Sequence, residues 1–315
     1  MNITNEYNKV HNIDFLNNNL PDKCAKLIIA DPPYYKTKGD FDFIWKTFDD
    51  YLVDVEKWSL ECKRILADNG TLLWYGDAKN IAYAQIIFDK HFNLLNCVVW
   101  ENTNDHKQQI RFNEDLRTFA PTTERILMYS TDFNVDAASY KNNFLPIKQY
   151  MREERSKCGL SASKLKEKTG LPCNLKLIGM YFGDAQWQLP TKENYEMMQT
   201  TGYWQKPFEV LREEFLLLRR PFNNALHLGD VIRLPNYETS DYDHDTIKPE
   251  KLTRILIKTC SRENDLVIVP FAGSGTECAM SAKEKRPFIG YEITEKHAIM
   301  SQKRADAILK EPTLF

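Results

Sequence analysis

The stretch VIVPFAGSGTECAMSAKEKRPFIGYEI, residues 267–293, contains the clearest signal of the fold. An apolar run ends at Pro270, a glycine-rich turn follows over 271–275, and a helical pattern covers 276–283. A second apolar run then ends in Glu292. This order of strand, turn, helix and strand predicts a βα unit of a parallel sheet, with the turn at the carboxyl edge of the sheet.

The first 130 residues show the same alternation of short apolar runs and amphipathic stretches, as in a parallel sheet flanked by helices. A helix is predicted over 48–67, with Asn69 and Gly70 as its C-cap. The pattern resumes near Lys248 with a helix over 251–260. We therefore expect an α/β fold. The further predicted strands are 9–13, 25–30, 71–75, 95–100 and 125–129.

The glycine-rich turn has the features of a ligand site. Its glycines let the backbone approach a ligand closely, and the helix that follows supplies free N–H groups. Glu292 stands 17 residues after Gly275 and could accept both hydroxyls of a ribose. The sequence lacks the GxGxxG and GxxxxGK[ST] patterns of pyrophosphate sites. A nucleoside cofactor without a pyrophosphate is therefore favoured, and S-adenosylmethionine is such a molecule.

A second motif, Asp31-Pro32-Pro33-Tyr34, directly follows the predicted strand 25–30. Together with Phe271-Ala272-Gly273-Ser274-Gly275 it resembles the motifs of the amino-methyltransferases that modify exocyclic amines of DNA bases. The order of the two motifs is similar to that of the beta group of this family. The resemblance excludes residues 136–240. It implies a Rossmann-like, seven-stranded, mostly parallel sheet with circularly permuted motif order.

The acid and prolines of the first motif suit amine methylation. The 6-amino group of adenine is a poor nucleophile because its lone pair is delocalised into the ring. Asp31 could accept one N–H and the carbonyl of Pro32 the other, which would aim the lone pair at the methyl group of the cofactor. Tyr34 would stack on the base after it leaves the duplex. By resemblance, Asp31 favours adenine, and cytosine N4 remains an alternative.

The resemblance also assigns a cofactor pocket. Asp14 and Phe15 would contact the adenine ring of the cofactor, although Asp14 could instead be an N-cap. Thr246 and Lys248 would contact its carboxylate. Val269 stands where the family usually has an acid, which removes a polar contact to the methionine part. The expected cofactor-binding residues are Asp14, Phe15, Asp31, Thr246, Lys248, Phe271, Ala272, Gly273, Ser274, Gly275, Thr276 and Glu292.

Residues 136–240 are predicted to form an inserted target-recognition domain, which divides a catalytic domain of residues 1–135 and 241–315. Between Lys141 and Met180 the chain carries nine Lys or Arg residues and three acids, a charge of +6 in a protein of −2 overall. This imbalance indicates an anionic partner.

Within this region, residues 147–182 predict helices separated by turns at Gly159 and Gly170, similar to a helix-turn-helix. The helix after Leu171 would enter the major groove of double-stranded DNA. Asn174 and Lys176 would face bases, and Arg152, Arg155 and Lys157 would meet phosphates. The alternative is a solvated helical face.

The sequence leads to one main hypothesis, site-specific adenine N6 methylation of duplex DNA. The alternatives are an RNA amine methyltransferase and a DNA-binding regulator with a degenerate methyltransferase fold. The seven cysteines include no CxxC pair, so we expect neither disulfides nor a metal site. No apolar run approaches the ~20 residues of a membrane helix, and no signal peptide is evident, so a cytoplasmic location is expected. Homodimers are common in the resembled group.

Overall fold

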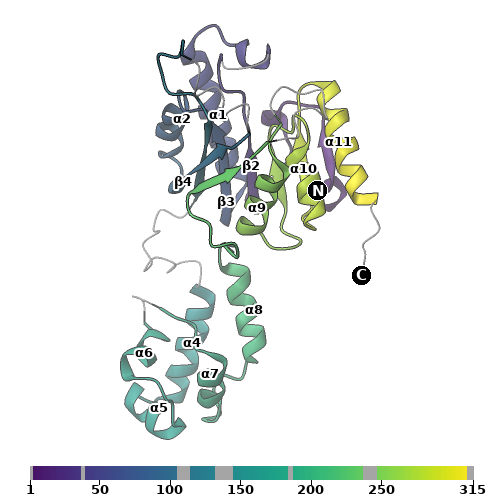
Figure 1. Ribbon diagram of the computed structural model, residues 1–315. Coiled ribbons are helices and arrows are strands. Elements are labelled where there is room, and N and C mark those ends of the chain that lie inside the picture. Colours follow the sequence, from purple (N-terminus) through teal and green to yellow (C-terminus); the bar gives the residue numbers. More distant parts are fainter. Residues whose placement is uncertain are drawn as a thin grey trace. The chain divides into compact units, whose positions relative to one another are not determined.

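The computed structural model describes residues 3–36, 40–104, 114–131, 145–183, 187–236 and 247–310. The chain divides into two compact units, shown in Figure 1. The first unit comprises Met1–Thr131 and Pro221–Phe315, and the second comprises Asp132–Arg220. No described helix is long and apolar enough to cross a membrane.

The described part of the first unit contains an eight-stranded sheet in the order β1-β8-β7-β2-β3-β5-β4-β6. Strand β5 runs antiparallel to β3 and to β4, and the other neighbours pair in parallel. The mostly parallel α/β sheet is confirmed. The strands are β1 Lys9–His11, β2 Ala25–Ala30, β3 Leu66–Gly76, β4 Asn93–Asn102, β5 Thr123–Ser130, β6 Val231–Leu234, β7 Val267–Val269 and β8 Phe288–Tyr291.

The sheet has eight described strands, one more than the resemblance implied, and β6 is the strand that was not predicted. It lies at the edge of the sheet and pairs in parallel with β4. The second unit ends at Arg220, whereas the sequence analysis extended the recognition region to residue 240. The difference arises because β6 is short and follows a polar stretch, so that its place in the sheet depends on a distant partner.

Helices cover both faces of the sheet, as Figure 1 shows. Helices α1 and α2 pack on the face that carries Ile28 and Ala30. Helices α9, α10 and α11 pack on the opposite face, with Leu27 and Ile29. Alternate residues of β2 are therefore buried on both sides, as expected of a parallel strand. The helices are α1 Phe48–Ile65, α2 Ile81–Phe88, α9 Glu250–Cys260, α10 Thr276–Lys283 and α11 Glu295–Lys310. Short 3₁₀ helices cover Ile3–Glu6 (η1), Phe15–Asn17 (η2) and Asp40–Phe43 (η3).

The C-cap predicted for α1 at Asn69 and Gly70 is wrong. Helix α1 ends at Ile65, and Leu66 already has extended backbone. Gly70 instead lies inside β3, where a Cβ atom would come within 2.5 Å of Leu66 Cδ1 and 3.0 Å of the Ala25 carbonyl oxygen. The glycine therefore permits a close approach between strands and does not end the helix.

The second unit consists of five described helices around its own apolar core. The helices predicted around Gly159 and Gly170 are present, and both glycines have positive φ, +66° and +71°. Glu154 is buried and accepts hydrogen bonds from the backbone N–H of Trp204 at 2.8 Å and from Lys157 Nζ at 2.6 Å. The helices are α4 Leu145–Cys158, α5 Ala162–Thr169, α6 Leu175–Met180, α7 Lys192–Gln199 and α8 Phe208–Leu218. The core contains Met151, Leu165, Ile178, Tyr195, Trp204 and Leu211.

Candidate active site

The two sequence motifs meet at one edge of the sheet. Strands β2 and β7 are neighbours that pair in parallel, with Leu27 opposite Val267 and Ile28 opposite Ile268. Asp31 directly follows β2, and the glycine-rich turn 271–275 follows β7. Because parallel strands end at the same edge, the acid and the turn lie side by side there.

Both carboxylate oxygens of Asp31 have partners from distant parts of the chain. The Tyr34 hydroxyl donates to Oδ1 at 2.5 Å, and Lys248 Nζ lies 2.7 Å from Oδ2. Glu124, at the start of β5, places Oε2 3.3 Å from both the Tyr34 hydroxyl and Lys248 Nζ. We refer to Asp31, Tyr34, Glu124 and Lys248 as the acid–lysine cluster.

The charges of this cluster depend on one another, and Lys248 is the most deeply buried of them. Lys248 is 3% exposed. Burial lowers the pKa of Lys248, but the carboxylates of Asp31 and Glu124 outweigh this effect and raise the pKa above its usual range. Burial and the same two carboxylates raise the pKa of Tyr34. Lys248 therefore stays charged and Tyr34 stays a hydrogen-bond donor at neutral pH.

Glu277, in the first turn of α10, lies next to the acid–lysine cluster. Its side chain is buried, and its Oε1 atom has no hydrogen-bond partner among the described residues. Burial, reinforced by the charge of Asp31, raises the pKa of Glu277 to about 7. The hydroxyl of Tyr75, on β3, is likewise buried without a described partner, and Lys248 Nζ lies 5.2 Å from the centre of its ring. Two buried polar atoms thus remain available to a ligand.

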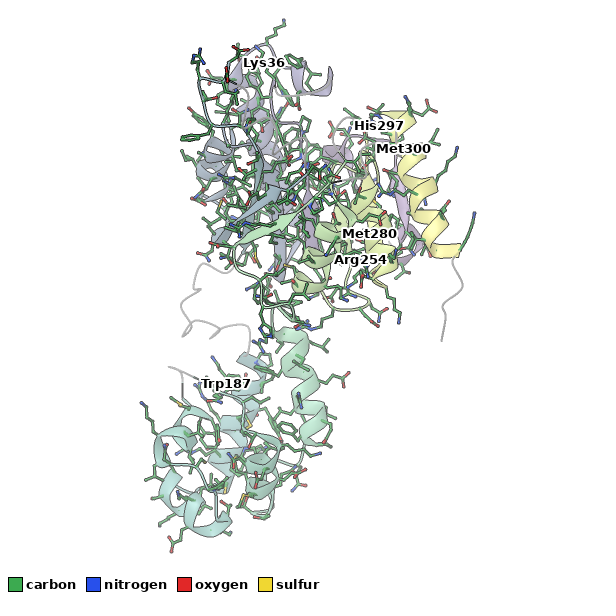
Figure 2. All side chains as sticks on the ribbon, viewed as in Figure 1. Lys36, Trp187, Arg254, Met280, His297 and Met300 are labelled. Carbon is green, nitrogen blue, oxygen red and sulfur yellow. The ribbon has the colours of Figure 1, made fainter. Side chains whose placement is uncertain are left out.

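Two polar side chains hold the backbone of the segment 32–36, which follows Asp31 and which we call the Tyr34 loop. Asp42 Oδ1 accepts a hydrogen bond from the Tyr34 N–H at 2.7 Å, and Asn80 Nδ2 donates to the Tyr34 carbonyl at 2.5 Å. Tyr35 and Lys36 have positive φ of +59° and +53°, a conformation that costs energy for such residues. The backbone N–H of Lys36, a residue labelled in Figure 2, donates to the Asp42 carbonyl at 2.7 Å.

The glycine-rich turn is joined to Glu292 by a hydrogen bond. The Gly273 N–H donates to Glu292 Oε2 at 2.9 Å, and the Thr294 N–H donates to Oε1 at 2.8 Å. Gly275 has a φ of +80°, and a Cβ atom there would lie 2.6 Å from Ser301 Cα. The turn therefore requires glycine at position 275 and presents its backbone beside a fixed carboxylate.

The hydroxyls of the turn face the protein interior. Ser274 and Thr276 are buried, with their oxygens 3.2 Å apart, and Arg304 Nη1 donates to Thr276 Oγ1 at 2.8 Å. The main chain of Ala272 is also fixed, because its N–H donates to the Tyr291 carbonyl at 2.8 Å. These hydrogen bonds fix the conformation of the turn and of the start of α10.

The other residues assigned to the cofactor are partly brought together. Phe15 is buried, with its ring centre 6.4 Å from that of Phe271. Asp14 Oδ1 accepts a hydrogen bond from the Leu16 N–H at 2.8 Å, so it is the N-cap of η2. Pro32 is the first residue of the Tyr34 loop, directly after Asp31. Thr246 lies outside the described residues.

Most of the residues predicted to contact DNA have partners within the second unit. Arg152 Nε donates to the Phe182 carbonyl at 2.8 Å, and the Arg155 guanidinium lies 4.6 Å from the centre of the Phe182 ring. Lys157 pairs with Glu154. The other two residues are on α6. Asn174 is its N-cap and accepts a hydrogen bond from the Leu177 N–H at 2.9 Å, and Lys176 is exposed.

Four further residues of the site were not predicted from the sequence: Glu124, Glu277, Tyr75 and Asn80. Glu277 had a detectable signal, because it is the one acid within the small and apolar run GTECAMSA. Glu124 opens the strand TERILMYS, where an acid at a strand end resembles an ordinary solvated position. The described residues include no group of three or more His, Cys, Asp or Glu side chains that could hold a metal ion.

Comparison with known proteins relates these motifs to a family. The family model for N6 and N4 methyltransferases, described as DNA methylase, matches residues 25–303. The type II methyltransferase M.HinfI of Haemophilus influenzae is 24% identical over 309 residues, which cover 93% of this chain and 66% of that protein. The DNA adenine methyltransferase YhdJ of Escherichia coli (strain K12) is 25% identical over 295 residues, 91% of this chain and 78% of that protein.

A solved structure shares the fold. TTHA0409 from Thermus thermophilus, solved in complex with S-adenosyl-L-methionine, superimposes with a TM-score of 0.52 at 16% identity, and the match covers 96% of each chain. The family match contains both motifs and both strands that carry them. The chain therefore belongs to the N6/N4 methyltransferase family of DNA methylases, which use S-adenosylmethionine as the methyl donor.

Proposed function

We propose that this chain transfers a methyl group from S-adenosylmethionine to the 6-amino group of adenine in duplex DNA. The observation that carries the proposal is the position of Asp31, which ends β2 directly beside the glycine-rich turn after β7. The preference for adenine that Asp31 implies by resemblance is the same as the specificity stated in the name of YhdJ. The family includes N4 methylases, so cytosine is the alternative substrate.

The residues present fit the cofactor. The turn 271–275 offers backbone atoms next to Glu292, whose two oxygens each accept one backbone hydrogen bond and retain further lone pairs for ribose hydroxyls. The orphaned Oε1 atom of Glu277 and the orphaned hydroxyl of Tyr75 supply unpaired polar groups nearby. When bound, the cofactor supplies an electrophilic methyl group.

The residues of the acid–lysine cluster would orient the target amine. Asp31 accepts one N–H of the amine in place of the Tyr34 hydroxyl, while Lys248 stays paired with Oδ2 and fixes the carboxylate. The carbonyl of Pro32 accepts the second N–H. The nitrogen lone pair would then point away from both acceptors and toward the methyl group. Formation of the N–C bond would break the bond between this methyl group and sulfur, and the methylated amine would then lose its proton to Asp31, which already accepts that N–H. The released Tyr34 ring would stack on the base.

The second unit would supply target recognition. Its segment from Lys141 to Met180 carries a net charge of +6, which favours binding to phosphates. Of the predicted contacts, Lys157, Asn174 and Lys176 are exposed, and Lys157 is paired with Glu154. The assignment of this unit to recognition, the cytoplasmic location and the homodimer remain predictions.

The experiment that tests the function combines one variant with product analysis. The change Asp31→Ala should lower the rate of methyl transfer to DNA by at least about 100-fold, since it removes a preorganised acceptor. Calorimetry should show that S-adenosylmethionine still binds, because the variant keeps the glycine-rich turn and Glu292 and loses only the cofactor contact predicted for Asp31 itself. Mass spectrometry of nucleosides from the methylated DNA should detect N6-methyladenine. Normal turnover by the variant would contradict the mechanism, and N4-methylcytosine would establish the alternative substrate.

A further inference from the structure

We propose that Glu277 recognises the α-ammonium group of the cofactor's amino-acid part, with the Tyr75 hydroxyl as a second acceptor. This inference rests on the proposed function and goes beyond it, because it assigns a cofactor contact to a residue outside both sequence motifs. Glu277 follows the glycine-rich turn by two residues and belongs to the first turn of α10. The turn and the acid are therefore held in one rigid segment.

One carboxylate oxygen of Glu277 has no hydrogen-bond partner in the part of the chain that the structure describes. The side chain is 4% exposed, and Oε1 makes no hydrogen bond to the described residues. A buried carboxylate oxygen without a donor is costly, and native proteins rarely retain one without a function. Lys248 and Arg304 influence the charge of Glu277. Both have closer partners, Asp31 at 2.7 Å for Lys248 and Glu250 at 2.8 Å for Arg304.

The local charge balance favours a cation as the missing partner. Asp31, Glu124 and Glu277 interact with Lys248, and the second cation near Glu277, Arg304, is paired with Glu250, so ionised Glu277 leaves an excess of negative charge among these described residues. The favourable interaction of this excess with a positive ligand is strengthened by burial. A cationic group that enters the site therefore restores the balance.

Hydrogen bonding distinguishes between the two cationic groups of the cofactor. The sulfonium has no N–H or O–H, whereas an ammonium donates three hydrogen bonds. Glu277 Oε1 and the Tyr75 hydroxyl, two oxygens without a partner among the described residues, therefore fit the ammonium. Val269, on the preceding strand, is buried and apolar and offers no alternative acceptor from its side chain.

The test compares three ligands by calorimetry with the wild-type chain and the variant Glu277→Gln. S-adenosylmethionine carries both cations, S-adenosylhomocysteine keeps the ammonium but lacks the sulfonium charge, and 5′-methylthioadenosine lacks the amino-acid part. We expect Glu277→Gln to weaken binding of the first two ligands by about 10- to 100-fold, the range of a charged hydrogen bond. Binding of 5′-methylthioadenosine should be unchanged. Glu263→Gln, at an exposed position, is the matched control.

Three results would overturn the inference. The first is an unchanged affinity of Glu277→Gln for S-adenosylmethionine. The second is a loss of affinity for S-adenosylmethionine alone, which would indicate that Glu277 recognises the sulfonium. The third is an equal loss of affinity for all three ligands, which would indicate a disturbed fold. Thermal unfolding of the variant checks the last of these. These outcomes differ from failure of the proposed function, in which the wild-type chain would bind no cofactor or Asp31→Ala would retain turnover.

Discussion

Lys248 Nζ lies 2.7 Å from Asp31 Oδ2, and this ion pair joins the end of β2 to the segment that precedes α9. The lysine is buried, so its charge depends on the two carboxylates of the acid–lysine cluster. In turn, Lys248 is the buried cation that balances Asp31 and Glu124. The pair therefore links the stability of the sheet edge to the geometry of the proposed catalytic acid.

Lys248→Met should destabilise the protein by up to about 3–5 kcal/mol at pH 7, because removing the buried lysine leaves two partly buried carboxylates without a counter-ion. Urea unfolding followed by circular dichroism would measure the loss. The control is Lys251→Met, an exposed lysine of α9, which should change the free energy of unfolding by less than about 0.5 kcal/mol. Equal effects of the two changes would show that the ion pair contributes nothing specific.

The adjacency of the two motifs could be predicted from the sequence. Each motif directly follows an apolar run that forms a strand, and parallel strands have their carboxyl ends at the same edge of the sheet. The strand and helix patterns around Asp31 and Gly275 depend on local spacing, and the structure confirms them. The edge strand β6 and the end of α1 were not predicted. Both depend on contacts with distant residues, such as the pairing of β6 with β4.

The candidate site was predictable in part for the same reason. The turn and the Asp31 motif could be recognised from their glycine and proline residues, because these residues constrain the backbone in ways that a short stretch of sequence reveals. Glu124 and Glu277 are acids at the starts of a strand and a helix, positions that are usually solvated. Only Glu277 had a local signal, its place in an apolar run, whereas the contacts of Glu124 arise from tertiary packing that no local pattern indicates.

Tyr34 allows its hydroxyl and its ring to be separated. Tyr34→Phe removes the donor to Asp31 but keeps a ring that can stack on the base, so methylation should fall by less than about 10-fold. Tyr34→Ala also removes the ring, and stacking on a base contributes about 1–3 kcal/mol, or about 5- to 150-fold. Single-turnover methylation of one duplex would measure both variants. A phenylalanine variant as impaired as the alanine variant would assign the effect to the hydroxyl.

Lys176 provides a test of the proposed recognition unit. The logarithm of the DNA-binding constant falls linearly as the logarithm of the salt concentration rises. If Lys176 contacts a phosphate of duplex DNA, Lys176→Ala should make this negative slope shallower by about 0.9. If it contacts a base, discrimination between sites should fall and the slope should stay the same. Lys192→Ala is the control, because Lys192 already pairs with Glu209. Fluorescence anisotropy between 50 and 200 mM salt would be a suitable measurement; salt-dependent affinity identical to wild type together with intact site discrimination would exclude both roles for Lys176.

Glu277 should make the free protein less stable as the pH rises. Its pKa is raised from 4.5 to about 7 by burial and by the charge of Asp31. The folded chain therefore holds a proton that the unfolded chain releases between these two values, and the associated stability is lost as the pH rises through this window. The full difference corresponds to about 3 kcal/mol.

The variant Glu277→Gln has no group that titrates at this position. Relative to the wild type, its free energy of unfolding should increase by up to about 3 kcal/mol between pH 4.5 and pH 8. The charged and titratable neighbours of Glu277 are present in both proteins, so their contributions largely cancel; they are Asp31, Lys248, Arg304, Tyr75 and Cys278. Urea unfolding without cofactor at the two pH values would measure the change, and a constant difference would refute it. Saturating S-adenosylmethionine should reduce the difference at pH 8, because the cofactor's cation would then compensate the ionised Glu277 of the wild type.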